Sequence, residues 1–131
     1  MITITYYNPD GKIADIREFN NKTKNDFHGM KIKCTLNNGN EKIGFANSYY
    51  SLETNDFITP AKAERLHYIV IETFINLDEE TNTFLGDDEH KFDVSRDKVL
   101  LSEIAHIDAI RYSGLRWGGI ITNRFVFRSR I

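Results

Sequence analysis

Cysteine, proline and long apolar runs are scarce in this chain of 131 residues. Its single cysteine, Cys34, excludes an internal disulfide and with it the disulfide-rich class of small domains. No apolar run reaches the roughly 18 residues that a membrane-spanning helix requires. Residues 1–7 have neither the basic region nor the long apolar segment of a secretory signal. We therefore expect a soluble cytoplasmic protein that does not contact a membrane.

Hydrophobic residues make up 40% of the chain and charged residues 27%. A chain of this size buries roughly two-thirds of its unfolded surface, so it can build a core without metal ions or disulfides. The composition excludes collagen, coiled coils and wholesale disorder. We expect residues 1–131 to form one domain that needs no cofactor.

Charge is unevenly distributed along the chain. Residues 1–52 contain seven basic and five acidic residues, whereas residues 53–108 contain five basic and fourteen acidic ones. Residues 109–131 contain five arginines and no acidic residue. Either the acidic middle and the basic end neutralise each other within the fold, or the basic end binds an acidic partner.

Apolar residues recur mostly with a period of two, which is typical of β-strands. Two such stretches, residues 2–7 and 13–19, flank residues 8–11, which read Asn-Pro-Asp-Gly. Proline fixes φ at the second position of a turn and glycine accepts a positive φ at its end. Residues 2–19 are therefore predicted to form a hairpin.

A second hairpin is predicted over residues 30–47. Apolar and polar side chains alternate from Met30 to Leu36. Residues 37–40 read Asn-Asn-Gly-Asn, a strong turn sequence because asparagine and glycine adopt left-handed angles at little energetic cost. The return strand runs through Ile43 and Phe45.

The middle of the chain contains one helix signal and one long strand signal. Thr59-Pro60 is typical of an N-cap and a first-turn proline, which predicts one short helix over residues 60–65. Residues 66–77 are rich in β-branched and aromatic side chains and predict a largely buried strand. Residues 83–85 are expected to pair back on it, and residues 86–93 to form an acidic surface loop.

Residues 98–110 fit either one helix or two strands that are joined by a tight turn at Ser102-Glu103. The density of β-branched side chains favours the two strands. Glycines at positions 114, 118 and 119 then mark a further turn. Residues 104–112 and 119–128 are predicted to form a last hairpin, with 113–131 as a basic C-terminal segment.

Two of these segments together resemble the small SH3-like and Sm-like β-barrels. The strand 30–36, the Asn-Gly turn and the strand that starts Lys-Ile-Gly-Phe at 42–45 resemble the opening of such a barrel, and residues 100–107 resemble its closing strand, turn and strand. Gly44 suits a strongly bent strand, where a side chain would obstruct the fold of the sheet. The resemblance covers about residues 27–112 and implies a mainly β, partly open barrel with an N-terminal hairpin, one short helix and a C-terminal strand. The Sm-type Ile-Arg-Gly motif is absent, so no nucleotide-binding residue is carried over.

Basic and aromatic side chains are interleaved near the C-terminal end, as on surfaces that bind single-stranded nucleic acid. The candidate binding residues are Arg111, Tyr112, Arg116, Trp117, Arg124 and Arg128. The alternative is an ordinary strand, with phenylalanines in the core and arginines in water.

Three further groups of residues have the right chemistry for a site. His106 and Asp108 share one face of a predicted strand, where a carboxylate could tune an imidazole base. The spacing of Asp78, Glu80, Asn82 and Glu89 matches part of a calcium loop, but a threonine replaces the required glycine. A metal could also be held with His67 or His106 by Asp87, Asp88, Glu89, His90 and Asp93. We expect solvated surface residues in each case, with no catalytic residue and no metal.

We therefore predict a non-catalytic binding module that joins a protein partner or a second copy of itself through open strand edges and the Trp117 region. The alternative function is RNA or single-stranded DNA binding through the arginine-rich end. The third is a small hydrolase-type enzyme that uses His106 and Asp108.

Overall fold

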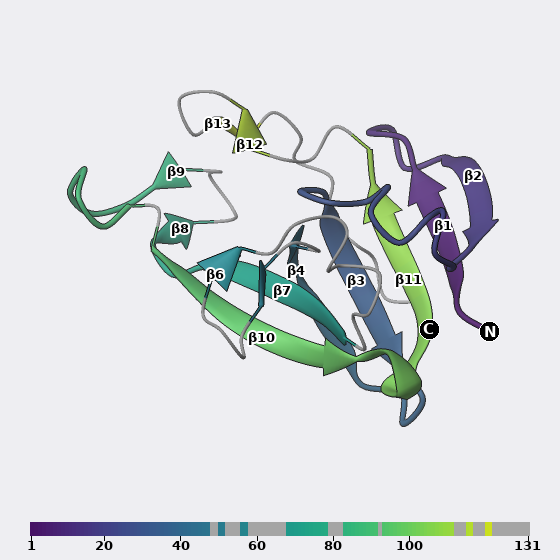
Figure 1. Ribbon diagram of the computed structural model, residues 1–131. Helices are drawn as coiled ribbons and strands as arrows, with labels where there is room; N and C mark the ends of the chain where they lie inside the picture. The colour runs from purple at the N-terminus through teal and green to yellow at the C-terminus, as the bar shows by residue number, and fades with distance from the viewer. Residues whose placement is uncertain are drawn as a thin grey trace.

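The structure is a computed structural model that describes residues 1–47, 50–51, 56–57, 68–78, 83–91, 93–111, 115–116 and 120–121. These residues form a mainly β structure, as the period-two pattern predicts (Figure 1). The main sheet contains β1 (Thr3–Tyr7), β2 (Ile13–Glu18), β3 (Lys31–Leu36), β4 (Glu41–Asn47), β7 (Tyr68–Phe74), β10 (Val94–Leu100) and β11 (Ile104–Ile110). Three small two-stranded sheets pair β5 (Tyr50–Ser51) with β6 (Asp56–Phe57), β8 (Leu77–Asp78) with β9 (Thr83–Phe84), and β12 (Leu115–Arg116) with β13 (Ile120–Ile121).

The seven strands of the main sheet follow the order β10-β7-β4-β3-β11-β1-β2. Each neighbouring pair is antiparallel except β1 and β11, which run parallel. The sheet is not closed, because β10 and β2 lie at its two ends. The prediction of a mainly β fold is confirmed. The predicted barrel is not confirmed, because the two end strands, β10 and β2, do not pair with each other.

The hairpins predicted over residues 2–19 and 30–47 are both present. β1 and β2 are joined by a turn in which the Gly11 N–H donates to the Asn8 carbonyl at 2.9 Å, and Gly11 has a φ of 86°. β3 and β4 are joined by a turn in which the Gly39 N–H donates to the Leu36 carbonyl, with a φ of 89° at Gly39. The local turn residues therefore determine these two pairings.

The two-strand interpretation of residues 98–110 is also confirmed. β10 and β11 are joined by the 3-10 turn η1 (Leu101–Glu103), which covers the predicted Ser-Glu turn. Among the residues that the structure describes, this 3-10 turn is the one helical segment. The short helix predicted at 60–65 lies outside the described residues.

The hairpin predicted between residues 104–112 and 119–128 is wrong. β11 has β3 on one side and β1 on the other, so neither edge is open for a third strand. The residue pair Ile120–Ile121 instead pairs with Leu115–Arg116. The physical reason is burial: side chains on both faces of β11 are buried, which is typical of a central strand.

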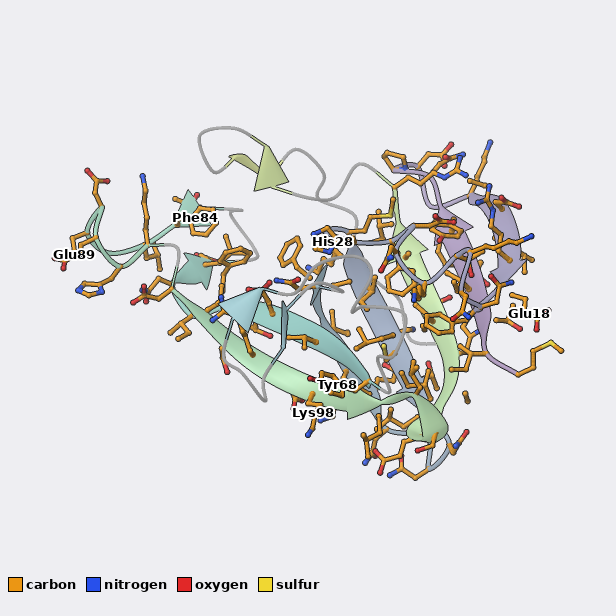
Figure 2. The ribbon with its side chains drawn as sticks, viewed as in Figure 1. Glu18, His28, Tyr68, Phe84, Glu89 and Lys98 are labelled. Atoms are coloured by element: carbon orange, nitrogen blue, oxygen red, sulfur yellow. The ribbon has the colours of Figure 1, made fainter. Side chains whose placement is uncertain are left out.

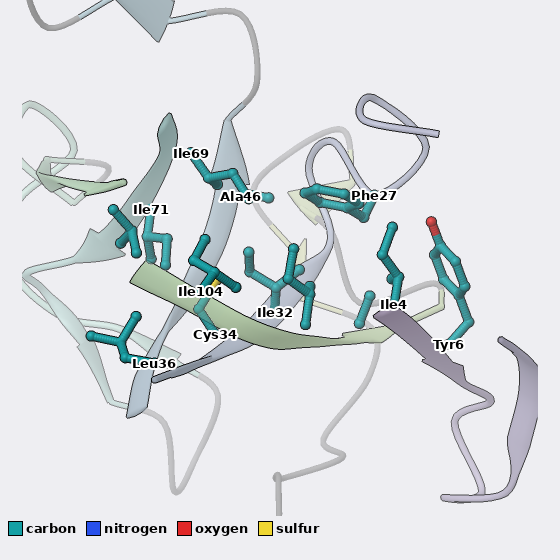
Figure 3. Packing of buried hydrophobic residues seen from close by; sticks show 13 residues of the cluster. Ile4, Tyr6, Phe27, Ile32, Cys34, Leu36, Ala46, Ile69, Ile71 and Ile104 are labelled. Carbon is teal, nitrogen blue, oxygen red and sulfur yellow. The ribbon is translucent and has the colours of Figure 1, made fainter. Parts of the chain in front are cut away.

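One face of the main sheet carries the hydrophobic core (Figure 3). Ile4, Ile32 and Ile107 come from three adjacent strands and have no exposed surface. Phe27, from the segment between β2 and β3, is also fully buried and packs against this face. The other core residues are Tyr6, Cys34, Leu36, Ala46, Ile69, Ile71, Val99, Ile104 and Ala109.

Gly44 lies on β4, directly against β7. A Cβ atom at this position would collide with the Ile71 Cγ2 atom and would lie 2.7 Å from the Glu72 carbonyl oxygen. Real Cβ atoms do not approach backbone oxygens so closely, so no side chain fits without a shift of one strand. A glycine is therefore required at this position by the close approach of β7. The strand bend that the resemblance implies at Gly44 stays a prediction.

Gly44→Ala is expected to lower the free energy of unfolding by about 1–3 kcal/mol, because the new methyl group must push β4 and β7 apart. Urea denaturation followed by circular dichroism measures the effect. Gly39→Asn is the control, since nothing lies within 4 Å of a Cβ there and asparagine accepts its φ of 89°. An unchanged urea midpoint for Gly44→Ala would contradict the close approach.

Candidate functional site

A row of polar residues crosses the sheet on the face opposite the core. Thr5 on β1 stands opposite Asp108 on β11, and Asp108 stands opposite Lys33 on β3. Their exposed fractions are only 6%, 1% and 2%. Charged groups are rarely buried so completely unless they are paired, which makes this row the first candidate for a functional site.

The row continues into a connected cluster. The His106 Nε2 atom lies 3.0 Å from Asp108 Oδ1 and 3.1 Å from Thr5 Oγ1. The Lys33 Nζ atom lies 3.9 Å from Asp108 Oδ2 and 3.7 Å from Glu41 Oε1. We call these five residues the polar cluster. The sequence placed His106 and Asp108 on one strand face, and the structure brings them into contact.

The contacts of the His106 ring do not form a catalytic triad. In a triad, the carboxylate and the nucleophile bind different ring nitrogens, so that the free one can take the nucleophile's proton. Here Asp108 and Thr5 both meet the same atom, Nε2. An Nε2–H that donates to the carboxylate cannot also accept a proton from the threonine. The geometry of the polar cluster therefore suits a structural hydrogen-bond network better than the active site of a hydrolase.

Cys34 is not a nucleophile either. It lies on the core face of β3 with no exposed surface. Burial raises the pKa of its thiol to about 12, and the negative charge of Asp108 acts in the same direction. The reactive form of cysteine is the thiolate, which is almost absent at neutral pH.

Of the predicted nucleic-acid residues, only Arg111 has a described side chain. Its guanidinium carbon lies 5.8 Å from the centre of the Tyr6 ring, and that of Arg17 lies 6.0 Å from the same ring. Burial, followed by the negative charge of Asp26, raises the pKa of Tyr6 to about 12. Arg116 contributes its backbone to β12, and its side chain is outside the description. Residues that lie outside the described part of the chain are Tyr112, Trp117, Arg124 and Arg128.

Two acidic residues of the loop predicted at 86–93 pair with basic residues of the same loop. His90 Nδ1 lies 3.0 Å from Asp93 Oδ2, and Lys91 Nζ lies 3.3 Å from Asp88 Oδ1. Among the residues that the structure describes, no three histidine, cysteine, aspartate or glutamate side chains gather as metal ligands. Residues of the two proposed metal sets that lie outside the description are His67, Glu80 and Asn82.

The β2 edge exposes two isoleucines that the sequence patterns did not single out. Ile13 stands opposite Tyr7 and Ile16 stands opposite Thr5, so both lie on the face of the polar cluster. They are 59% and 58% exposed. They are three residues apart and still share a face because a bulge interrupts the pairing between Tyr6 and Tyr7.

Asp15 partly protects this edge. Its Oδ1 atom accepts a hydrogen bond from the Ile16 N–H at 2.9 Å, and its Oδ2 atom accepts one from Arg17 Nε at 2.7 Å. The Arg17 guanidinium lowers the pKa of the Asp15 carboxyl group below its usual value. Asp15 is therefore charged at neutral pH and occupies a backbone donor that an incoming strand would need.

The opposite edge, β10, carries charges that are held against its own sheet. Arg96 Nε lies 3.4 Å from Glu72 Oε2, and Asp97 pairs with Lys42. Figure 2 shows Lys98 beside Tyr68, and its Nζ atom lies 5.1 Å from the centre of that ring. Edge charges of this kind discourage pairing with another chain. Of the two ends of the sheet, β2 is thus the better surface for a partner.

No family model, no curated protein and no solved structure matches this chain. Within the described ranges, no helix is long and apolar enough to cross a membrane.

Asp108→Asn is expected to lower the free energy of unfolding by about 3 kcal/mol, because it leaves the buried Lys33 ammonium without this carboxylate. Urea denaturation gives the value. Asp97→Asn, which breaks the exposed pair with Lys42, should cost less than about 1 kcal/mol. Equal costs for the two variants would show that the polar cluster is no more buried than a surface ion pair.

Cys34 is expected to resist iodoacetamide at about pH 8, because a thiol with a pKa of about 12 has only about one thiolate in ten thousand molecules there. Mass spectrometry should find the native protein unlabelled and the protein in concentrated guanidinium chloride fully labelled. Rapid labelling of native protein would contradict the burial of β3.

Proposed function

We propose that this protein is a non-catalytic binding module that associates with a second copy of itself through the β2 edge. The observation that carries the proposal is the pair of exposed isoleucines, Ile13 and Ile16, on one face of an edge strand. An edge strand offers backbone donors and acceptors to another chain, and an edge that is not used for pairing is commonly covered or charged. Pairing of two such edges would remove the isoleucines of both copies from water.

The sequence of β2 is complementary to itself. Two copies of a strand can pair antiparallel about a two-fold axis normal to the sheet, which keeps every side chain on its own face. When Ile16 stands opposite Ile16 of the second copy, Asp15 stands opposite Arg17 in both directions. Opposite charges directly across two strands stabilise their pairing, so this register is favoured by charge and by apolar contact together.

Asp15 makes the association reversible. In the single chain its carboxylate holds the Ile16 N–H, and that hydrogen bond must break before the N–H can donate to a second strand. The same carboxylate then has Arg17 of the other copy as its partner. Because one hydrogen bond and one ion pair are exchanged for similar ones, the net gain comes from the isoleucines, and we expect weak, concentration-dependent pairing.

The proposal includes the resemblance to SH3-like and Sm-like barrels for about residues 27–112. Support comes from the order β10-β7-β4-β3-β11, in which consecutive strands are neighbours and the last strand returns to the first. The 3-10 turn η1 joins the last two of them, as the resemblance implies. The hairpin of β1 and β2 extends this arrangement beyond β11, which makes β2 the edge available to a partner.

Nucleic-acid binding through the basic end is the second candidate. Its support is the composition of residues 109–131, which contain five arginines and no acidic residue. The contact of Arg111 with Tyr6 favours an intramolecular role for that arginine. A salt-sensitive gel shift of a labelled oligonucleotide would support this candidate over self-association.

Sedimentation equilibrium is expected to show a monomer–dimer equilibrium that Ile16→Lys weakens by about tenfold or more, since it places a charge in the apolar contact. Ile43→Lys is the matched control, because Ile43 is 43% exposed on the same face but lies on β4, away from the edge. A protein that remains monomeric at high concentration, or an equal effect of the two variants, would refute the proposal.

A mixing experiment tests the register. Asp15→Arg and Arg17→Asp each place like charges opposite one another in a homodimer, so each variant alone should be monomeric. An equimolar mixture places opposite charges across the strands and should form a heterodimer, although the internal Asp15–Arg17 pair is broken in both chains. If the mixture stays monomeric while the wild type dimerises, the register is wrong.

A further inference from the structure

The turn between β3 and β4 contains a chemically reactive pair of residues. Asn38 is followed by Gly39, and no other asparagine of the chain is followed by a glycine. Both residues are exposed to solvent. Nothing lies within 4 Å of a Cβ placed at Gly39, so no neighbouring side chain crowds its backbone. The backbone nitrogen of Gly39 is therefore the least hindered nucleophile that any asparagine side chain of this protein has beside it.

Hydrogen bonds of the turn prepare the Asn38 side chain for attack. The Asn40 N–H donates to Asn38 Oδ1 at 2.9 Å. A donor at this position stabilises the negative charge that develops on the oxygen when a nucleophile adds to the side-chain carbonyl. The Gly39 N–H donates to the Leu36 carbonyl at 2.9 Å, and this bond must open before the nitrogen attacks. Opening costs little free energy at an exposed turn.

We propose that Asn38 is a site of spontaneous deamidation in the folded protein. The Gly39 nitrogen forms a bond to Asn38 Cγ, the Cγ–Nδ2 bond breaks, and the proton of the Gly39 N–H leaves with the amide nitrogen as ammonia. Water then opens the resulting five-membered imide. Cleavage of the new bond gives aspartate, whereas cleavage of the original peptide bond gives isoaspartate, in which the main chain runs through Cγ. Water is the one reactant that the protein does not supply.

The turn between β1 and β2 provides an internal comparison, because Asp10 and Gly11 have the same surroundings. The N–H two residues after Asp10 donates to Asp10 Oδ1 at 2.9 Å, and the Gly11 N–H donates to the carbonyl three residues before it at 2.9 Å. Gly11 has a φ of 86° and Gly39 one of 89°. The two turns differ in the group that is attacked. A carboxylate resists nucleophilic addition because of its negative charge, so we expect Asn38 to react first.

Deamidation would act on the contact between this turn and η1. The Asn37 N–H donates to the Glu103 carbonyl at 2.8 Å, and Asn37 Nδ2 donates to the Ser102 carbonyl at 3.1 Å. Both products add a negative charge next to Asn37, and isoaspartate also adds one carbon atom to the main chain of the turn. We expect these changes to shift Asn37 and weaken its two bonds to η1. The site is separate from the β2 edge and does not depend on self-association.

Incubation of the native protein at mildly alkaline pH, followed by trypsin digestion and mass spectrometry, tests the proposal. Peptide 34–42 should gain one mass unit at Asn38 and separate into an aspartate and an isoaspartate form. Isomerisation of Asp10, which is followed by chromatographic elution because it leaves the mass unchanged, should be about tenfold slower or more. Asn21, an exposed asparagine that is followed by lysine, should remain unmodified over the same period.

Gly39→Asn is the matched variant, because asparagine accepts a positive φ but places a side chain beside the attacking nitrogen. Its Asn38 should react about tenfold more slowly than that of the wild type. The urea midpoint of the aged wild type should fall below that of fresh protein, whereas Gly39→Asn treated in the same way should keep its own.

Three results would overturn the proposal. An unmodified Asn38 in native protein, with modification in guanidinium chloride, would show that the folded turn protects it. Equal rates in the wild type and Gly39→Asn would show that the Gly39 nitrogen is not the attacking group. An unchanged urea midpoint of fully deamidated protein would show that the contact with η1 is not weakened. Circular dichroism of Gly39→Asn establishes that the variant is folded, so its rate reports on the turn.

Discussion

The parallel pairing of β1 with β11 is the contact on which the rest of the arrangement depends. It places Thr5 beside Asp108 and so completes the polar cluster on one face. On the other face it places Ile4 beside Ile107 in the core. Because β1 pairs with β2 as well, the edge strand at this end of the sheet is β2 and not β11. One strand pairing therefore determines what is buried in the centre and what is offered at the edge.

Much of this fold follows from local sequence, because turn residues and alternation act over a few positions. The Asn-Pro-Asp-Gly and Asn-Asn-Gly-Asn turns identify both hairpins, and the β-branched residues of 98–110 identify two strands. The neighbours of β11 could not be identified in this way. A buried strand is recognisable from its composition, but composition does not say which strands lie beside it. The neighbours of β11 are β1 and β3, and not the strand that is predicted at 119–128.

In the candidate sites, too, contacts between residues close in sequence were predictable and contacts between distant strands were not. His106 and Asp108 are two residues apart, so their common face was predictable, whereas Lys33 joins them only through the register of β3 with β11. The common face of Ile13 and Ile16 is not predictable from the sequence, because a bulge changes the two-residue period that identifies a shared face. The described part of the chain tests the arginine-rich surface only at Arg111, which contacts Tyr6. Side-chain groupings that depend on strand register or on a bulge therefore cannot be predicted from sequence patterns.

The distance in sequence between β1 and β11 has a consequence for how the chain is made. Thr5 and His106 touch although 101 positions separate them. During synthesis, β1 leaves the ribosome long before β11, its parallel neighbour, has been made. The edge of β1 that pairs with β11 therefore stays open until the last quarter of the chain emerges. Contacts of this range slow folding, because the connecting chain must lose entropy before they form. During that interval the open edge of the β1–β2 hairpin is free to pair with a wrong strand.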